Sequence, residues 1–181
     1  LSAFAVLLSR QSGDSDLTIG APLATRDHQD LESMLGILLG NLVLRIDTTD
    51  APSFAALLAQ VRQTMLAALE NSAIPFEQIV DALPIRRDLS RNPLFQVFFN
   101  MLNLPQAGYQ SPQLQVSGLD ATLLDAKFDL TLYAQDDASG LLLHMVYNRS
   151  LFGAARMQEM LRQLHTLLEQ ICQQPQLAID Q

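Results

Sequence analysis

An apolar stretch directly after a polar one most constrains how this chain folds. Residues 94–99 read Leu-Phe-Gln-Val-Phe-Phe, whereas residues 86–93 before them are mostly charged or polar. Apolar side chains at both alternating positions of a strand indicate that both of its faces are covered, which is typical of a central strand. We therefore predict a strand over residues 94–102 in the middle of a sheet, entered from a polar loop.

Four further strands follow from alternating apolar residues with turn residues at their ends. We predict them over residues 17–23, 42–46, 128–134 and 141–148. The last two are separated by Asp-Asp-Ala-Ser-Gly at residues 136–140, a composition typical of a hairpin turn. Five strands with helices between them predict an α/β (α+β) lobe.

Apolar residues at helical spacing predict three well-defined helices. Ser53 is a suitable cap for the first, and Pro75 stands at a favoured first-turn position of the second. Residues 152–173 form a long amphipathic pattern. Shorter helices are predicted over residues 1–9 and 30–38. The predicted core-facing residues are Phe54, Leu57, Leu58, Val61, Met65 and Leu69 in the first helix, Phe76, Ile79, Val80 and Leu83 in the second, and Met157, Met160, Leu161, Leu164, Leu167, Leu168 and Ile171 in the third.

The net charge of −8, with no cluster of more than two adjacent basic residues, argues against binding to nucleic acid or to an anionic membrane. No apolar run approaches the ~18 residues of a membrane span, so we expect a cytoplasmic protein. The chain has no initiating Met and starts within a helical pattern, so we expect a piece of a longer polypeptide. Its one cysteine, Cys172, is expected to be partly buried and unreactive, and it excludes an internal disulfide or thiolate metal cluster.

Generic catalytic patterns are absent from the sequence. It contains no glycine-rich phosphate loop, no G-x-S-x-G and no pair of histidines at metal-binding helical spacing. His28, His144 and His165 are far apart in sequence, and we interpret all three as structural. Ser90 has no base beside it, and we expect it to bond the local backbone. Residues 103–127 show only a weak pattern over a long stretch, which is typical of a functional loop.

Six segments resemble conserved motifs of one family when they are taken in order. Residues 16–26 read DLTIGAPLATR, similar to D-x-x-x-G-x-P-x-x-x-R. Residues 35–45 read LGILLGNLVLR, similar to I-G-x-F-V-N-T-L-x-x-R. Residues 71–77 (NSAIPFE) resemble H/N-Q-D-x-P-F-E, and residues 87–94 (RDLSRNPL) match R-D-x-S-R-N-P-L almost unchanged. Residues 127–130 (KFDL) and 147–152 (YNRSLF) are similar to the last two strands and the start of the final helix. The set resembles condensation domains of nonribosomal peptide synthetases.

This resemblance implies one lobe of the chloramphenicol-acetyltransferase-like fold, with about five strands in a mixed sheet and helices packed on it. Such domains have two lobes with a tunnel between them, in which the amine of an acceptor aminoacyl thioester attacks a donor acyl or peptidyl thioester. The family motif H-H-x-x-x-D-G, which lies in the N-terminal lobe, is absent here. The resemblance therefore implies a C-terminal lobe over residues 1–172, with residues 103–127 as an excursion that crosses to the other lobe and residues 173–181 as the start of a linker.

The resemblance also implies the partners and the cofactor use. The partners are the N-terminal lobe, donor and acceptor carrier proteins and a neighbouring adenylation domain, with self-association through the exposed lobe face as a further expectation. The substrates arrive on the phosphopantetheine of the carrier proteins, so no cofactor and no metal is expected on this chain. Without the motif of the other lobe, the chain alone is expected to be inactive.

No catalytic residue is expected in this lobe, but two sets of residues are implied as functional. Gly40, Asn41 and Arg45 are candidates to line the tunnel or orient substrate. The second set is a structural signature: Arg87, Asp88, Ser90, Arg91, Asn92, Pro93 and Asp129. Because dense charge beside a buried strand is costly unless it is paired, we expect at least two of Arg87, Asp88, Arg91 and Asn92 to be largely buried and paired.

Two departures from the family pattern leave alternatives open. Gly40 stands where the family has the Asn of F-V-N-T, so either the reaction centre is impaired or Asn41 replaces that Asn after a small backbone shift. Ser72 and Ala73 stand in place of Gln-Asp. A non-catalytic module that recruits a tailoring enzyme or carrier protein is the main alternative. An epimerising or cyclising relative and a free-standing acyltransferase are remoter ones.

Overall fold

A mixed five-stranded sheet organises the part of the chain that the computed structural model describes, residues 1–25, 29–49, 53–85, 88, 90–102, 125–137 and 140–179. The strand order is β2-β1-β3-β4-β5. β1, β3 and β4 are parallel, while β2 and β5 run antiparallel to their neighbours. The predicted α+β class is thus confirmed. The strands are β1 (Asp16–Ala24), β2 (Leu39–Asp47), β3 (Val97–Met101), β4 (Leu130–Asp137) and β5 (Gly140–Tyr147).

The apolar stretch forms the central strand β3, as predicted, but the strand starts three residues later than residue 94. Leu94 has φ 68°, in the left-handed region, and this interrupts the extended backbone just before the strand. Phe98 is buried on one face of the sheet, and Val97 and Phe99 pack into the core on the other.

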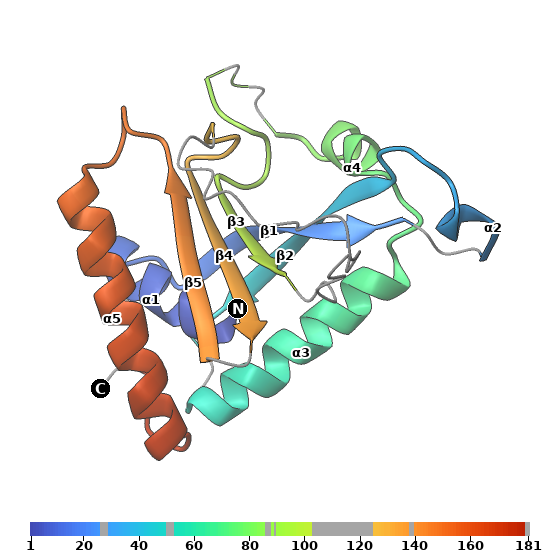
Figure 1. Ribbon diagram of the computed structural model, residues 1–181. Helices are drawn as coiled ribbons and strands as arrows, with labels where there is room; N and C mark the ends of the chain where they lie inside the picture. The colour runs from blue at the N-terminus through green and yellow to red at the C-terminus, as the bar shows by residue number, and fades with distance from the viewer. Residues whose placement is uncertain are drawn as a thin grey trace, which may run out of the picture.

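Helices α1 (Ser2–Ser12), α3 (Phe54–Glu70) and α5 (Ala154–Gln173) cover one face of the sheet. Figure 1 shows α5 alongside β5, with α1 next to it. The core between these helices and the sheet includes Phe4 of α1, Leu57 of α3 and Leu164 of α5, each 2% exposed or less. Burial of these apolar surfaces is the main stabilising term of the lobe.

The predicted apolar stripe of α3 is correct only in part. Ser53 caps the helix as predicted, accepting a hydrogen bond from the Ala56 amide at 3.3 Å. Leu57 and Val61 are buried, and Phe54, Met65 and Ala68 pack beside them, but Leu58 and Leu69 are exposed. The inward-facing residues of α3 recur every three or four positions and end at Ala68. Leu58 and Leu69 each directly follow one of these residues, so they lie on the solvent side of the helix.

The stripe of α5 is confirmed: Met157, Met160, Leu164 and Leu167 are buried, and the other predicted residues pack against the core. Cys172 is exposed, so its expected partial burial is wrong. It follows Ile171, the last residue of the stripe, and therefore points away from the core. The described residues contain no helix that is long and apolar enough to span a membrane.

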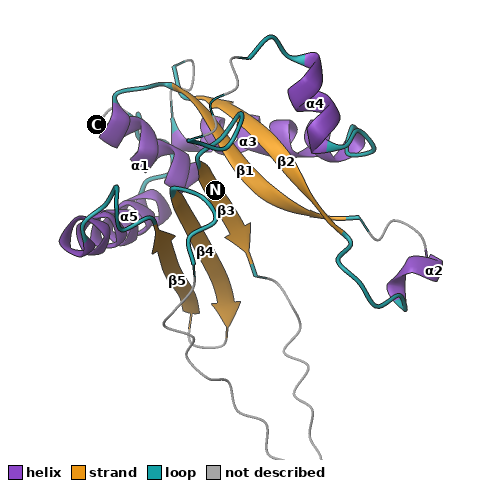
Figure 2. Cartoon of the chain, turned by 90° about the horizontal axis from the view of Figure 1, so that it is seen from above, coloured by secondary structure: helices purple, strands orange, loops and turns teal. Residues whose placement is uncertain are grey.

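The helix predicted over residues 30–38 is wrong beyond its first turn. α2 covers only Gln29–Glu32, and the chain then bends through Gly36, whose φ of 157° does not continue a helix. Figure 2 shows α2 projecting beyond the ends of β1 and β2. The apolar side chains in this segment are exposed rather than packed: Met34 at 51%, Leu35 at 102%, Ile37 at 90% and Leu39 at 67%.

The second face of the sheet carries an aromatic cluster formed by Phe76, Phe95, Phe98 and Phe128. Phe95 is central, with ring centroids 5.6 Å from Phe76 and 5.3 Å from Phe128, and Phe98 stacks on Phe128 at 4.6 Å. Phe76 opens α4 (Phe76–Ala82), one residue later than predicted, because Pro75 is an extended N-cap and not a first-turn residue. No residue of this helix is fully buried: of its predicted core-facing residues, Phe76, Ile79 and Val80 are half-buried, and Leu83 is exposed, so that part of the prediction is wrong.

The chain after α5 returns to the start of α3. The carbonyl of Pro175 accepts a hydrogen bond from the Ala55 amide at 2.9 Å, and that of Leu177 accepts one from Phe54 at 3.3 Å. The Arg10 guanidinium donates to the carbonyl of Ile179. Of the predicted features, residues 103–124 of the excursion, His28 and Arg87 lie outside the described residues.

Candidate functional site

The signature loop, residues 88 and 90–94, is held by local pairing. The Asp88 carboxylate accepts hydrogen bonds from the Ser90 amide at 2.9 Å and the Ser90 hydroxyl at 2.7 Å, and lies 3.3 Å from Arg91 Nε. Ser90 therefore bonds a neighbouring carboxylate and not, as predicted, the backbone. The hydrogen bonds from Ser90 hold the pKa of Asp88 below its usual range, with a smaller contribution from Arg91.

The expected burial of the signature charges is wrong. Asp88, Arg91 and Asn92 are all exposed, with side-chain exposures of 50% for Asp88 and 63% for Arg91. With three of the four residues exposed, two cannot be buried. The loop runs over the surface beside α4, so its charges pair in solvent without the desolvation cost that motivated the prediction. Asn92 also donates to the carbonyl of Lys127 at 3.1 Å, which ties the loop to the chain entering β4.

Leu94 lies at the point where the polar signature loop meets the aromatic cluster. Its left-handed backbone is unusual for a residue with a side chain and costs roughly 1–2 kcal/mol. The turn is held by the Thr18 hydroxyl, which donates to the Leu94 carbonyl at 2.6 Å, and by the Phe95 amide, which donates to Pro93 at 2.8 Å. The next residue, Phe95, is thereby placed over β1, where it is 1% exposed.

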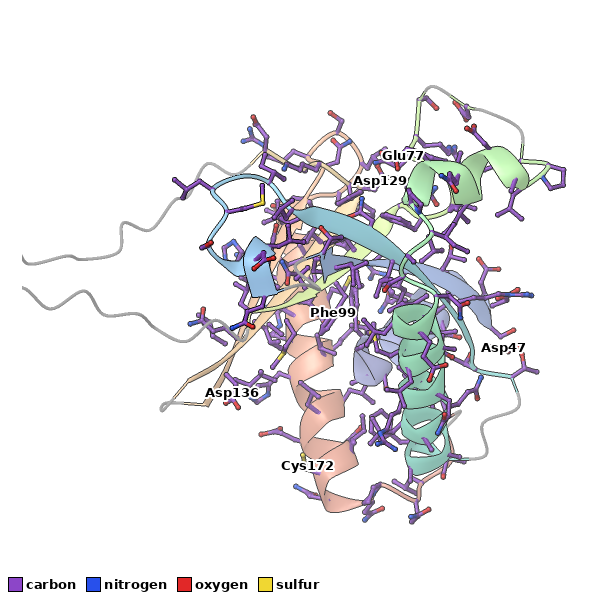
Figure 3. The ribbon with its side chains drawn as sticks, turned by 90° about the vertical axis from the view of Figure 1, so that its right-hand side faces the viewer. Asp47, Glu77, Phe99, Asp129, Asp136 and Cys172 are labelled. Carbon is purple, nitrogen blue, oxygen red and sulfur yellow. The ribbon has the colours of Figure 1, made fainter. Side chains whose placement is uncertain are left out.

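Asp129 lies on the other side of the same region. It is half-buried, and its carbonyl accepts a hydrogen bond from the Asn148 amide at 2.9 Å, joining the start of β4 to the end of β5. Figure 3 shows Asp129 at the same end of the molecule as Glu77 of α4. The contacts of Phe95 with both Phe76 and Phe128, the neighbours of these two acidic residues, agree with that placement.

Two cavities share α4 as a wall. The first, here called the signature groove, has a volume of about 750 Å³ and lies between α4 and the signature loop. Its lining includes Val80, Ile85 and Leu94 together with the charged Asp88 and Arg91. The second, here called the edge cavity, has a volume of about 380 Å³ and lies between the β1–β2 edge and residues 72–77. Phe76 and Glu77 line both.

The structure brings together two of the three predicted tunnel residues. Gly40 and Asn41 line the edge cavity, but Arg45 does not. Arg45 instead forms a two-pronged pair with Asp16, with N–O distances of 2.9 and 2.8 Å. Its hydrogen bonds are the main reason that the pKa of Asp16 lies below its usual range.

Asn41 is poorly placed to replace a side chain at position 40. Gly40 pairs with Leu23 on the face that packs against α3, whereas Asn41 pairs with Pro22 on the opposite face. A one-residue shift of β2 would turn Leu42, Leu44 and Ile46 out of the core. The structure therefore argues against the replacement by a backbone shift.

Three further residues of the edge cavity, Ser72, Ala73 and Glu77, were not predicted as site residues from the sequence. The match of residues 71–77 to a family motif is the sequence signal that could have identified them. His144 and His165 line neither cavity. In the described part of the chain, no group of three or more His, Cys, Asp or Glu residues is placed to hold a metal ion.

Known proteins similar to this chain include synthases from Brevibacillus species. Tyrocidine synthase 3 of Brevibacillus parabrevis is 39% identical over 171 residues, covering 94% of this chain. Gramicidin S synthase 2 of Brevibacillus brevis is 35% identical over 181 residues, covering 100%. The chain spans only 3% and 4% of these relatives. It belongs to the condensation domain family, whose model matches residues 1–181.

Solved structures agree with this assignment and with the fold. A four-domain nonribosomal peptide synthetase, holo-AB3403, bound to AMP and glycine, matches with a TM-score of 0.88 and 25% identity, over 98% of this chain and 15% of that one. The X-domain from teicoplanin biosynthesis also matches with a TM-score of 0.88, at 26% identity, over 99% of this chain and 42% of that one.

Proposed function

We propose that residues 1–172 form the C-terminal lobe of a condensation domain that makes amide bonds in nonribosomal peptide synthesis. One observation carries this proposal: the chain superposes over 99% of its own length on an X-domain chain, yet covers 42% of it. A share slightly under half is what one lobe of a two-lobed domain would cover. The sequence also lacks the H-H-x-x-x-D-G motif that the family carries in the other lobe.

In the proposed reaction, the acceptor amine attacks the carbonyl carbon of the donor thioester. The C–N bond forms and the C–S bond breaks. The amine loses a proton to a base of the N-terminal lobe, which passes it to the departing thiolate, so that the donor phosphopantetheine leaves as a thiol. Both phosphopantetheine arms belong to the partner carrier proteins. This lobe contributes a wall that holds the two thioesters in line and excludes water.

We assign one end of the sheet as the surface that contacts the N-terminal lobe. At this end β1 and β3 finish and β2 and β5 begin. This end carries the exposed segment 34–39 described above. Met101 at 38%, Leu141 at 48% and Leu142 at 57% exposure lie at the same end. The run of exposed apolar residues over 34–39 is larger than the single exposed residues that are normal on a protein surface, and such patches are typical of an interface. We propose that the excursion over residues 103–127 crosses to the other lobe from here. Because Gln173 ends α5 and residues 175, 177 and 179 bond to α1 and α3, we propose that the linker towards an adenylation domain, expected over residues 173–181, begins only after this contact.

The test compares this chain alone, the chain mixed with its N-terminal lobe, and the intact domain. Each is incubated with two loaded carrier proteins, and the tethered amide is measured by mass spectrometry. We expect product from the intact domain, none from this chain alone, and partial recovery in the mixture. Turnover by this chain alone would contradict the half-domain assignment, and an intact domain that forms no amide would contradict the catalytic one.

A second candidate is a condensation-like module that recruits another enzyme. It is favoured by the match to the X-domain, which is as good as the match to the four-domain synthetase, and by a solved complex of that X-domain with OxyB, at 28% identity to this chain. The absence of the family Asn at Gly40 points the same way. An intact domain that binds a tailoring oxygenase but forms no amide would favour this function.

A further inference from the structure

Three of the smallest residues in proteins line the edge cavity, and they come from two separate segments of the chain. Gly40 lies on β2, while Ser72 and Ala73 lie in the turn between α3 and α4. These are the positions at which the chain departs from the family pattern described above. Each departure shortens a side chain, from Asn to Gly at position 40 and from Gln-Asp to Ser-Ala at 72–73. The fold thus brings both departures to one cavity.

Backbone geometry does not require glycine at position 40. The positive-φ glycines of the described residues are Gly13, Gly36 and Gly140, and Gly40 is not among them. A Cβ built on Gly40 would lie 3.4 Å from Thr25 Cγ2 and 3.6 Å from Leu23 Cδ2, which is ordinary van der Waals contact. A side chain is therefore sterically possible at this position, and its absence leaves space in the cavity.

The lining of the cavity mixes polar and apolar groups, and the polar groups contribute slightly more of its surface. Leu23, Leu39, Ile74 and Phe76 contribute apolar surface, and Leu39 and Ile74 are 67% and 51% exposed. Covering such surface with an apolar group is favourable by about 25 cal/mol per Å². Asn41 and Glu77 supply polar groups at the same cavity. Its volume of about 380 Å³ falls within the ordinary range of small-ligand sites, roughly 300–1,000 Å³.

We propose that the edge cavity is a specificity subsite that receives a large side chain of a thioester-bound amino acid, and that Gly40, Ser72 and Ala73 set its size. This inference rests on the proposed function, because it assumes that tethered substrates meet beside this lobe. The cavity adjoins the exposed segment 34–39 through Leu39, which places it next to the surface assigned to the N-terminal lobe.

The experiment uses the intact domain with both lobes and carrier proteins loaded with Ala, Val, Leu or Phe. One arm varies the donor and the other varies the acceptor. Gly40→Asn and Ala73→Asp restore the longer side chains of the family pattern. We expect each to raise the Ala-over-Phe ratio of kcat/KM about tenfold, because the steric fit of a side chain in its pocket discriminates by roughly 10–200-fold. The arm that responds identifies whether the donor or the acceptor occupies the cavity.

Matched variants separate this effect from general damage. Gly153→Asn makes the same replacement at a glycine whose added Cβ would have no atom within 4 Å, and it should leave the ratio unchanged. Ser72→Gln provides a third, independent way to narrow the cavity, with the exposed Ser150→Gln as its control. Unfolding midpoints for all variants identify any that fail to fold.

The outcomes distinguish the subsite from the proposed function. A wild-type domain that forms no amide with any pair contradicts the proposed function, and the subsite with it. An active domain in which all cavity variants slow Ala and Phe equally, or change neither, contradicts the subsite alone.

Discussion

The ring of Phe95 lies directly against the backbone of Gly20. A Cβ built on Gly20 would be 2.3 Å from Phe95 Cε2, closer than real Cβ atoms approach. Gly20 belongs to the first of the motifs recognised in the sequence, and Phe95 directly follows the 87–94 motif. Their contact joins two motifs on the second face of the sheet, at the centre of the aromatic cluster.

We predict that Gly20→Ala destabilises the lobe by about 1–3 kcal/mol, because overpacking must displace a ring that is 1% exposed. Urea unfolding measures the change. Gly40→Ala is the matched control, since its Cβ would find ordinary contacts only. Combining Gly20→Ala with Phe95→Leu should cost less than the sum of the two single changes. Strict additivity would show that Gly20 and Phe95 do not meet as described.

We predict that Arg91→Ala lowers the melting temperature by no more than about 2 °C, because exposed ion pairs contribute little. The 63% exposure of the Arg91 side chain is the reason. Phe95→Ala, which removes a buried ring a few residues away, should lower it far more. Calorimetry on the two variants decides between a surface loop and a buried charge network. A decrease in melting temperature for Arg91→Ala as large as that for Phe95→Ala would show that Arg91 belongs to a buried network.

The pair between Asp16 and Arg45 predicts a component of acid sensitivity. The pKa of Asp16 is lowered in the folded state, chiefly by the hydrogen bond from Arg45. The pair therefore stabilises the fold above the unfolded-state pKa of about 4, and this contribution is lost as the pH falls through the folded-state pKa.

The measurement is the urea midpoint of the wild type and Arg45→Ala between about pH 7 and pH 2. The wild type should be the more stable at neutral pH, and the difference should narrow in acid. Arg62→Ala, which removes the same charge from an exposed position on α3, should not show this narrowing. A constant gap for Arg45→Ala would mean that the pair does not stabilise the fold.

Leu94 offers a test of backbone strain in the signature loop. Leu94→Gly and Leu94→Ala both delete the side chain, but only glycine adopts φ 68° without steric cost. We expect the glycine variant to be the more stable of the two by about 1 kcal/mol. At Leu83, where φ is −94°, the order should reverse or vanish. A less stable glycine variant at position 94 would show that the left-handed turn is not maintained in solution.

The local pattern of apolar residues correctly predicted those elements whose burial can be inferred from adjacent residues in the sequence. The apolar residues at both alternating positions of 94–99 placed β3 at the centre, and the long stripe placed α5 on the core. Leu58 and Leu69 were misassigned because several faces of an apolar helix are plausible until a sheet selects one. The signature charges were misassigned because exposure depends on what covers a loop.

The candidate site was predictable only as a set of separate residues. Gly40 and Asn41 were named, but alternation along a strand separates them onto opposite faces. Ser72 and Ala73 join Gly40 only because the turn after α3 passes the edge of β2. No local sequence pattern predicts that these three residues line the same cavity.

The first turn of α4 separates the signature groove from the edge cavity. Phe76 and Glu77 face the signature groove on one side and the edge cavity on the other, and the helix behind them has no residue anchored in the core. The two spaces therefore do not have independent sizes. A tilt of this seven-residue helix about the Phe76 ring would widen one space at the expense of the other, so a molecule that fills the groove would change the room left for a side chain in the cavity.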